Sequence, residues 1–186
     1  TVAIALLRIC QNALYIFFPE KSIHGAGLKG SIYSKIETPP TLSLAKLSTG
    51  VKTINRQGRE YIFDPVRKKY LVLTPEEWVR QQVLEYMIDV KSYPVSLISV
   101  EKRIRLGNNW KRYDILVYRN EKPWLVVECK EEQEVLGEAV LRQLLSYNSK
   151  LKTDYLVITN GHSLHCYEVG REQWSNALPD YGQTKE

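Results

Sequence analysis

The sequence predicts an α/β fold in which a mixed sheet is flanked by helices, in the order α-β-β-β-α-β. Two segments, residues 75–90 and 134–151, carry apolar residues at helical spacing. Short apolar runs bounded by turn residues are typical of strands, and they occur at 96–106, 110–118, 123–130, 155–158 and 163–169. Because helices alternate with strands, we expect one sheet packed between helices.

The composition favours a soluble globular protein of one domain plus an arm. The chain has 186 residues, of which 44% are hydrophobic and 25% charged, which excludes a disordered or collagen-like protein. Cys10, Cys129 and Cys166 are odd in number and widely spaced, so they predict neither a disulfide framework nor paired zinc ligands. This favours a reducing compartment, and we expect a cytoplasmic protein.

Residues 1–53 are interpreted as a basic N-terminal arm. Residues 1–74 carry 11 Lys and Arg against 4 Asp and Glu, whereas residues 75–186 carry 15 against 17. Residues 1–18 are apolar, but Arg8, Gln11 and Asn12 interrupt them, so we expect no membrane span. Residues 19–53 show no clear period, and the arm is either poorly ordered or a wrongly assigned start. Its charge either holds phosphates or is simply solvated.

Residues 54–73 predict a β-hairpin extension ahead of the main domain. Apolar runs at 61–63 and 70–73 flank the turn residues Asp64 and Pro65.

The first helix is predicted to begin immediately after this hairpin. Thr74 is a capping residue, Pro75 takes the first helical position, and Glu77 lies three residues beyond the cap. The helix should end near residue 90, before Tyr93 and Pro94. Its expected buried stripe consists of Val79, Val83, Met87 and Val90.

The remaining elements complete a domain over residues 74–170, followed by a C-terminal tail at 171–186. Turns are predicted at 107–109, 120–122 and 160–161. Apolar residues of the second helix recur at helical spacing, namely Leu136, Val140, Leu144 and Tyr147. Trp78, Trp110 and Trp124 are expected to be core or edge aromatics rather than base-stacking platforms.

Charged residues at the ends of neighbouring strands suggest a metal site. Asp114 lies on one strand, and Glu128, Cys129 and Lys130 end the next. Because side chains alternate across a strand, Glu128 and Lys130 share one face, while Cys129 offers that face only its carbonyl. Two carboxylates beside a lysine suit Mg²⁺ better than zinc. The alternative is an ordinary surface ion pair just past the sheet edge.

A second cluster, His162, His165 and Cys166, is a poor metal site, because alternation sets the two histidines on opposite faces.

Residues 74–167 resemble the N-terminal nuclease domain of type I restriction enzyme R subunits, a branch of the PD-(D/E)XK nuclease superfamily. The family pattern is a helix with Glu, a strand with Asp, a strand ending in Glu-x-Lys, a helix with Gln-x-x-x-Tyr, and a strand pair. The matching residues here are Glu77, Asp114, Glu128, Lys130, Gln143 and Tyr147. The resemblance therefore implies a restriction-endonuclease-like fold.

The resemblance also implies roles for these residues. Asp114 and Glu128 would bind Mg²⁺, with Mn²⁺ as a substitute, and the Cys129 carbonyl could add a ligand. Lys130 would serve the hydrolytic water. Gln143 and Tyr147 would border the site and contact DNA or the lysine, or simply pack the tyrosine on the sheet.

Other roles stay open. Tyr113 replaces the family's usual proline. Glu76, Glu77 and Glu85 compete as the first-helix carboxylate, with Glu77 favoured by position, and helix capping is a rival role for the first two. Arg80, Lys111 and Arg112 either contact phosphate or pair with Glu77 and Glu101.

The expected function is that of a Mg²⁺-dependent DNA endonuclease-like domain of this R-subunit type. The sequence contains no phosphate loop of the Gly-x-x-x-x-Gly-Lys-Ser/Thr type, so it carries no ATP-driven motor of its own. We expect DNA as the main partner, together with a protein that supplies specificity or translocation. The alternative is a non-catalytic nucleic-acid-binding or interaction module on the same fold. The sequence leaves open an RNA substrate, endo- or exonucleolytic action, and the oligomeric state.

Overall fold

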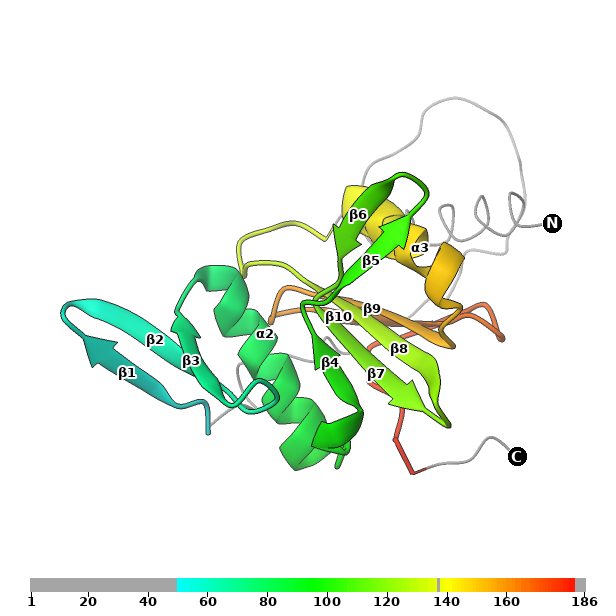
Figure 1. Ribbon diagram of the computed structural model, residues 1–186. Coiled ribbons are helices and arrows are strands. Elements are labelled where there is room, and N and C mark those ends of the chain that lie inside the picture. Colours follow the sequence, from blue (N-terminus) through cyan, green and yellow to red (C-terminus); the bar gives the residue numbers. More distant parts are fainter. Residues whose placement is uncertain (1–49, 137, 183–186) are drawn as a thin grey trace, which may run out of the picture.

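The computed structural model describes residues 50–136 and 138–182, in which a central sheet lies between two helices (Figure 1). The six-stranded sheet has the order β11-β10-β9-β8-β7-β4, and only β8 and β9 pair in parallel. Its strands are β4 (Ile98–Val100), β7 (Ile115–Arg119), β8 (Lys122–Cys129), β9 (Tyr155–Thr159), β10 (Leu164–Glu168) and β11 (Gln173–Ser175). The helices are α2 (Pro75–Glu85) and α3 (Glu138–Leu151). The predicted mixed α/β fold and the element order are confirmed.

Alternation along the central strands builds one apolar core on each side of the sheet. On the α2 side, Ile115 of β7 belongs to the same buried cluster as Val79 and Val83. On the α3 side, Leu116 belongs to a second cluster with Leu144 and further residues of β8 and β9. The sheet is therefore buried on both faces, which matches the continuous apolar runs of β8 and β9.

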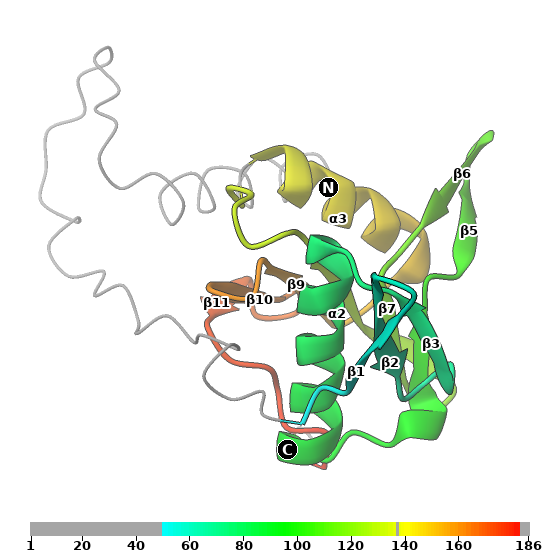
Figure 2. The same cartoon turned by 90° about the vertical axis from the view of Figure 1, so that its left-hand side faces the viewer.

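A small three-stranded antiparallel sheet packs beside α2 (Figure 2). It consists of β1 (Thr53–Arg56), β2 (Arg59–Asp64) and β3 (Lys69–Val72). The predicted hairpin is β2–β3, whereas β1 was not predicted. The N-terminal arm lies, up to residue 49, outside the described residues.

The first helix begins where the sequence predicts. Thr74 Oγ1 accepts a hydrogen bond from the Glu77 N–H at 3.1 Å, and Pro75 occupies the first turn. Beyond Glu85 the helix continues as a π-helical segment, Tyr86–Val90. Val90 is 53% exposed, so its predicted burial is wrong. A π-turn holds more residues than an α-turn, and this rotates the last position of the stripe away from the core.

Two predicted strands are each broken in two. A 3₁₀ turn (Val95–Leu97) precedes β4, and the next strand is β5 (Arg103–Leu106). It pairs with β6 (Asn109–Arg112) in a separate two-stranded sheet, the β5–β6 ribbon. Glu101 has a φ of 50°, which turns the chain out of the main sheet, and its N–H donates to the Asp114 carbonyl at 2.9 Å. Continuous strands at 96–106 and 110–118 were therefore a wrong prediction.

Other boundaries also differ from prediction. α3 begins at Glu138 rather than 134, because residues 131–134 form a turn closed by the Glu134 N–H and the Glu131 carbonyl. The segment predicted as a tail contains β11, which pairs with β10. Trp124 is buried as expected, whereas Trp110 is 63% exposed on the ribbon. None of the described helices has the length and apolar character needed to cross a membrane.

Candidate active site

Asp114 and Glu128 lie at the same end of the β7–β8 pair. The antiparallel register joins Ile115 to Val127, and one further step sets Asp114 opposite Glu128. Asp114 Oδ2 accepts a hydrogen bond from the Cys129 N–H at 2.7 Å. Both acids are buried, at 6% and 3% exposure. Both carboxylates are therefore largely shielded from water.

Lys130 completes this group. Its ammonium Nζ lies 3.1 Å from Glu128 Oε1, and its backbone N–H donates to the Thr159 carbonyl of β9 at 2.8 Å. The structure thus brings Asp114, Glu128 and Lys130 together at the carboxyl end of β8.

Burial and mutual repulsion alter the acidity of both carboxyl groups. Burial raises the pKa of Asp114, against the opposing effect of Arg80. Burial, aided by the charge of Asp114, raises the pKa of Glu128 to about 8, although Lys130 opposes this shift. Burial lowers the pKa of Lys130, but Glu128 outweighs this effect and the net pKa is raised. In the metal-free protein the lysine is therefore an ammonium ion at neutral pH.

Arg80 of α2 reaches Asp114 from the α2 side of the sheet. Its Nη2 donates to Asp114 Oδ1 at 2.9 Å and to Glu76, and its Nη1 donates to Glu77. Its side chain is only 3% exposed. Both oxygens of Asp114 thus have a protein donor.

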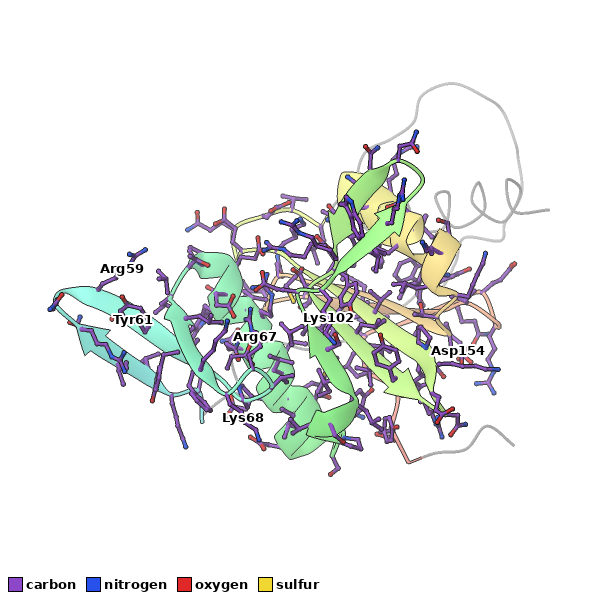
Figure 3. All side chains as sticks on the ribbon, viewed as in Figure 1. Arg59, Tyr61, Arg67, Lys68, Lys102 and Asp154 are labelled. Atoms are coloured by element: carbon purple, nitrogen blue, oxygen red, sulfur yellow. The ribbon has the colours of Figure 1, made fainter. Side chains whose placement is uncertain are left out.

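Glu77 lies in a buried ion cluster that reaches Asp114 through Arg80. Arg67, in the turn between β2 and β3, donates to Glu77 Oε1 at 3.0 Å (Figure 3 shows Arg67 beside α2). Gln81 donates to the same oxygen at 2.7 Å. Arg67 also donates to Asp64 and Glu101. The sequence interpretation missed Arg67 and Asp64, because a charged turn between strands looks like ordinary surface.

The three competing glutamates of the first helix occupy different environments. Glu76 contacts Arg80, and its charge adds to the raised pKa of Asp114 and of Glu128. Glu77 belongs to the arginine cluster. Glu85, two turns further, accepts the Gly50 N–H. Glu76 is thus the one of the three whose charge acts on both acids.

Gln143 and Tyr147 lie one helical turn apart on α3. The Gln143 Nε2 donates to Glu128 Oε1 at 2.6 Å and to the Tyr147 hydroxyl at 2.8 Å. The Tyr147 hydroxyl donates to the Arg112 carbonyl at 2.9 Å, and its ring is buried in the α3-side core. Gln143 therefore contacts Glu128 directly, whereas Tyr147 holds the Gln143 side chain in position. The Arg112 guanidinium pairs with Glu101 at 3.1 Å.

Asp114 and Glu128 fit a magnesium ion, because one carboxylate oxygen of Glu128 lacks a hydrogen-bond partner. Glu128 Oε2 is buried and has no hydrogen-bond partner among the described residues. Within that same part of the chain, no group of three or more His, Cys, Asp or Glu is arranged to hold a metal. Mg²⁺, however, keeps several waters and binds through one or two carboxylates.

The second cluster noted in the sequence consists of His162, His165 and Cys166. In the structure, His162 Nε2 lies 3.5 Å from Glu132 Oε2.

Comparison with protein families gives one match. The family described as type I restriction enzyme R protein N terminus matches residues 75–180, more than half of the chain, from the start of α2 to beyond β11. The curated proteins and the solved structures give no match. The matched segment contains every residue of the Asp114, Glu128 and Lys130 group, and the chain belongs to the type I restriction enzyme R protein N-terminal family.

Proposed function

We propose that this domain hydrolyses DNA phosphodiester bonds with the help of Mg²⁺, as a nuclease of the PD-(D/E)XK type. One observation carries the proposal: Asp114 and Glu128 are buried close enough for the charge of Asp114 to act on Glu128, and Lys130 pairs with Glu128, in a chain of a restriction enzyme family. Family membership supports a role in restriction-modification. A partner protein would supply sequence specificity or translocation.

Asp114 and Glu128 would hold the metal, with the Cys129 carbonyl as a third oxygen. The unpartnered Glu128 Oε2 supports this assignment, because a buried oxygen without a donor favours a cation. Mg²⁺, or Mn²⁺ in its place, would neutralise a scissile phosphate and lower the pKa of a coordinated water. Ionised carboxylates are needed for this, so the raised pKa of Glu128 makes metal affinity increase with pH.

Lys130 would act as a fixed positive charge. Its raised pKa keeps the amine protonated in the metal-free protein, so it stabilises the negative charge that develops on the phosphate rather than accepting a proton. Gln143 holds Glu128 through Oε1 and leaves Oε2 for a ligand. Glu77 would act as a positioning residue, because it reaches Asp114 through Arg80.

A non-catalytic nucleic-acid-binding module is the second candidate, and the Arg80–Asp114 ion pair favours it. Arg80 binds Oδ1 of Asp114, a carboxylate that would hold the metal. In a nuclease, Arg80 must give up or share this oxygen. In a binding module the pair would simply be part of the buried ion cluster.

The test is DNA cleavage by wild type, Asp114→Asn and Lys130→Ala, on supercoiled and single-stranded DNA with Mg²⁺ or Mn²⁺. Wild type should cut, and each variant should lose at least about 10²-fold in rate, the usual loss when a charge-stabilising group is removed. Calorimetric titration of Mn²⁺ should show one site in wild type and none in Asp114→Asn.

Matched controls lie at the opposite end of the same strands. Asp154 immediately precedes β9 and is exposed (Figure 3), and Lys122 begins β8. Asp154→Asn and Lys122→Ala should cut like wild type. DNA binding without cutting in either metal, together with no metal site by calorimetry, would leave the binding module as the better account.

A further inference from the structure

The β5–β6 ribbon projects from the body of the domain in both views (Figures 1 and 2). It is hydrogen-bonded within itself and forms a sheet separate from the main one. Residues 102–112 contain five Lys and Arg and no Asp or Glu. The ribbon is therefore a strongly cationic projection on a domain whose residues 75–186 are slightly acidic as a whole.

The two faces of the ribbon differ. Cross-strand pairing joins Arg103 to Arg112 and Arg105 to Trp110, so these four side chains share one face. Ile104, on the other face, packs against the α3-side core, and Lys150 of α3 donates to the Arg105 carbonyl at 2.7 Å. The arginine face therefore points away from α3.

Most charges on and beside the ribbon are not neutralised within the fold. On the arginine face, Arg112 pairs with Glu101, but Arg103 has no ion-pair partner among the described residues. Outside that face, Lys102 and Lys111 likewise have no ion-pair partner in the described part of the chain. Arginines directly opposite each other on a strand pair repel and destabilise it. Trp110 is 63% exposed, so its apolar ring on the ribbon is left in contact with water. An anionic ligand would relieve the repulsion and cover the ring.

The base of the ribbon is attached to the candidate active site. β6 ends at Arg112, two residues before Asp114, and the Arg112 carbonyl accepts the Tyr147 hydroxyl. Lys102 lies where the chain leaves β4 for β5 (Figure 3). Strands of this length extend about 13 Å, so the tip of the ribbon lies about that far from its base beside Asp114.

Shape favours a duplex as the ligand. Paired strands lie about 4.8 Å apart, and the major groove of B-DNA is about 12 Å wide, enough to admit a two-stranded ribbon. Single-stranded sites, in contrast, are usually basic grooves. A cavity of about 460 Å³ has a lining that includes Glu60, Glu131 and Glu132, whose charges would repel phosphate.

We propose that the β5–β6 ribbon is the arm by which the domain grips duplex DNA, with the Arg103, Arg105 and Arg112 face on the phosphates of one groove and Trp110 against the sugar-phosphate wall. The inference rests on the proposed function, since it names the surface that presents DNA to the Asp114 and Glu128 site.

The test is equilibrium binding of the full chain to a labelled duplex in EDTA, across a salt series, by fluorescence anisotropy. The triple variant Arg103→Gln, Arg105→Gln, Arg112→Gln should weaken binding at least about tenfold and reduce the salt slope by about 2 to 3. Trp110→Ala should weaken binding about threefold or more. Circular dichroism confirms that each variant is folded.

A matched control removes the same charge elsewhere. Lys68, Lys69 and Lys122 are exposed and lie outside the ribbon. Their triple change to Gln should alter affinity by less than about threefold. Equal weakening by both triples would overturn the proposal, because net charge alone would explain it. Absence of duplex binding by wild type, or a preference for single-stranded DNA or RNA, would also overturn it.

Cleavage separates this inference from the nuclease proposal. If wild type cuts DNA but the ribbon triple keeps full duplex affinity, the ribbon proposal fails and the nuclease stands. If the ribbon triple loses affinity while wild type cuts in no metal, the ribbon proposal stands and the nuclease fails.

Discussion

The guanidinium of Arg80 and the carboxylate of Asp114 form a buried ion pair, with Nη2 2.9 Å from Oδ1, although the two residues are 34 positions apart in sequence. The pair joins the centre of α2 to the start of β7. Under the proposed function, the same carboxylate would also hold the metal.

Removing Arg80 should be strongly destabilising. In Arg80→Met, the carboxylates of Asp114 and Glu77 remain buried without their main cation, and broken buried pairs of this kind cost about 3 to 5 kcal/mol. Urea denaturation measures the loss. Arg171→Met is the control, since Arg171 is 64% exposed and its pair with Glu168 should be worth less than about 1 kcal/mol. Similar losses in both variants would contradict a central role for Arg80.

The metal-free protein should become less stable as pH rises from about 4.5 to about 8. Glu128 has a folded-state pKa of about 8 against 4.5 in the unfolded chain. In that window the folded state keeps a proton that the unfolded state has released, so deprotonation favours unfolding. The slope from one such group is at most about 1.4 kcal/mol per pH unit. Denaturation in EDTA at a series of pH values measures it.

Glu128→Gln is the control for this pH dependence, because the amide cannot titrate. Its stability should vary less between pH 4.5 and 8 than that of wild type. Two identical pH profiles would show that the raised pKa belongs to another group.

Tyr147→Phe should destabilise the domain by about 1 to 3 kcal/mol. The hydroxyl donates to the Arg112 carbonyl and accepts from Gln143, so its loss leaves that carbonyl without this donor and Gln143 with only Glu128 as acceptor, in a partly buried region. Thermal denaturation measures the change. Tyr61→Phe, on a half-buried tyrosine of the small sheet, should stay within about 0.5 kcal/mol. A Tyr147 variant as stable as the control would mean that these two hydrogen bonds contribute little.

Thr74→Ala should cost about 0.5 to 2 kcal/mol, because it removes the acceptor for the Glu77 N–H at the start of α2. Thr74→Ser keeps an oxygen at that position and should recover most of the loss. Chemical denaturation of the three proteins provides the comparison. If Ser and Ala cost the same, the methyl group of Thr74 matters rather than its hydroxyl.

Structural features that depend on residues close together in the sequence were predicted correctly. Thr74 and Pro75 mark the start of α2, and Asn120 and Glu121, both at positive φ, form the tight turn before β8. The apolar period of α3 also identified Leu144 and Tyr147 as buried. These signals act over one or two turns of chain, so a single sequence contains them.

Features that depend on distant partners were not predicted. The break at Glu101 is held by the Asp114 carbonyl and by Arg67, 34 residues away, so no local pattern marks it. β1 and β11 are short and mostly exposed, and their few apolar residues give no clear period. The pairing of Arg80 with Asp114 likewise needs the fold before it can be seen.

Only part of the candidate site could be predicted from the sequence. Strand alternation correctly separates Glu128 from Cys129, with Cys129 in the α2-side core and Glu128 bonded to α3. Arg67 and Asp64 were missed because their burial comes from packing the small sheet on α2, a long-range contact.

The six-stranded sheet ends on both sides in strands of three residues, β4 and β11. Long, flat borders with free N–H and C=O groups recruit strands from other chains and promote aggregation. Here each edge strand offers only a few free backbone N–H and C=O groups. At β4, the kink at Glu101 ends the strand and with it the line of free groups. We therefore expect concentrated preparations of the domain to resist fibril formation through this sheet.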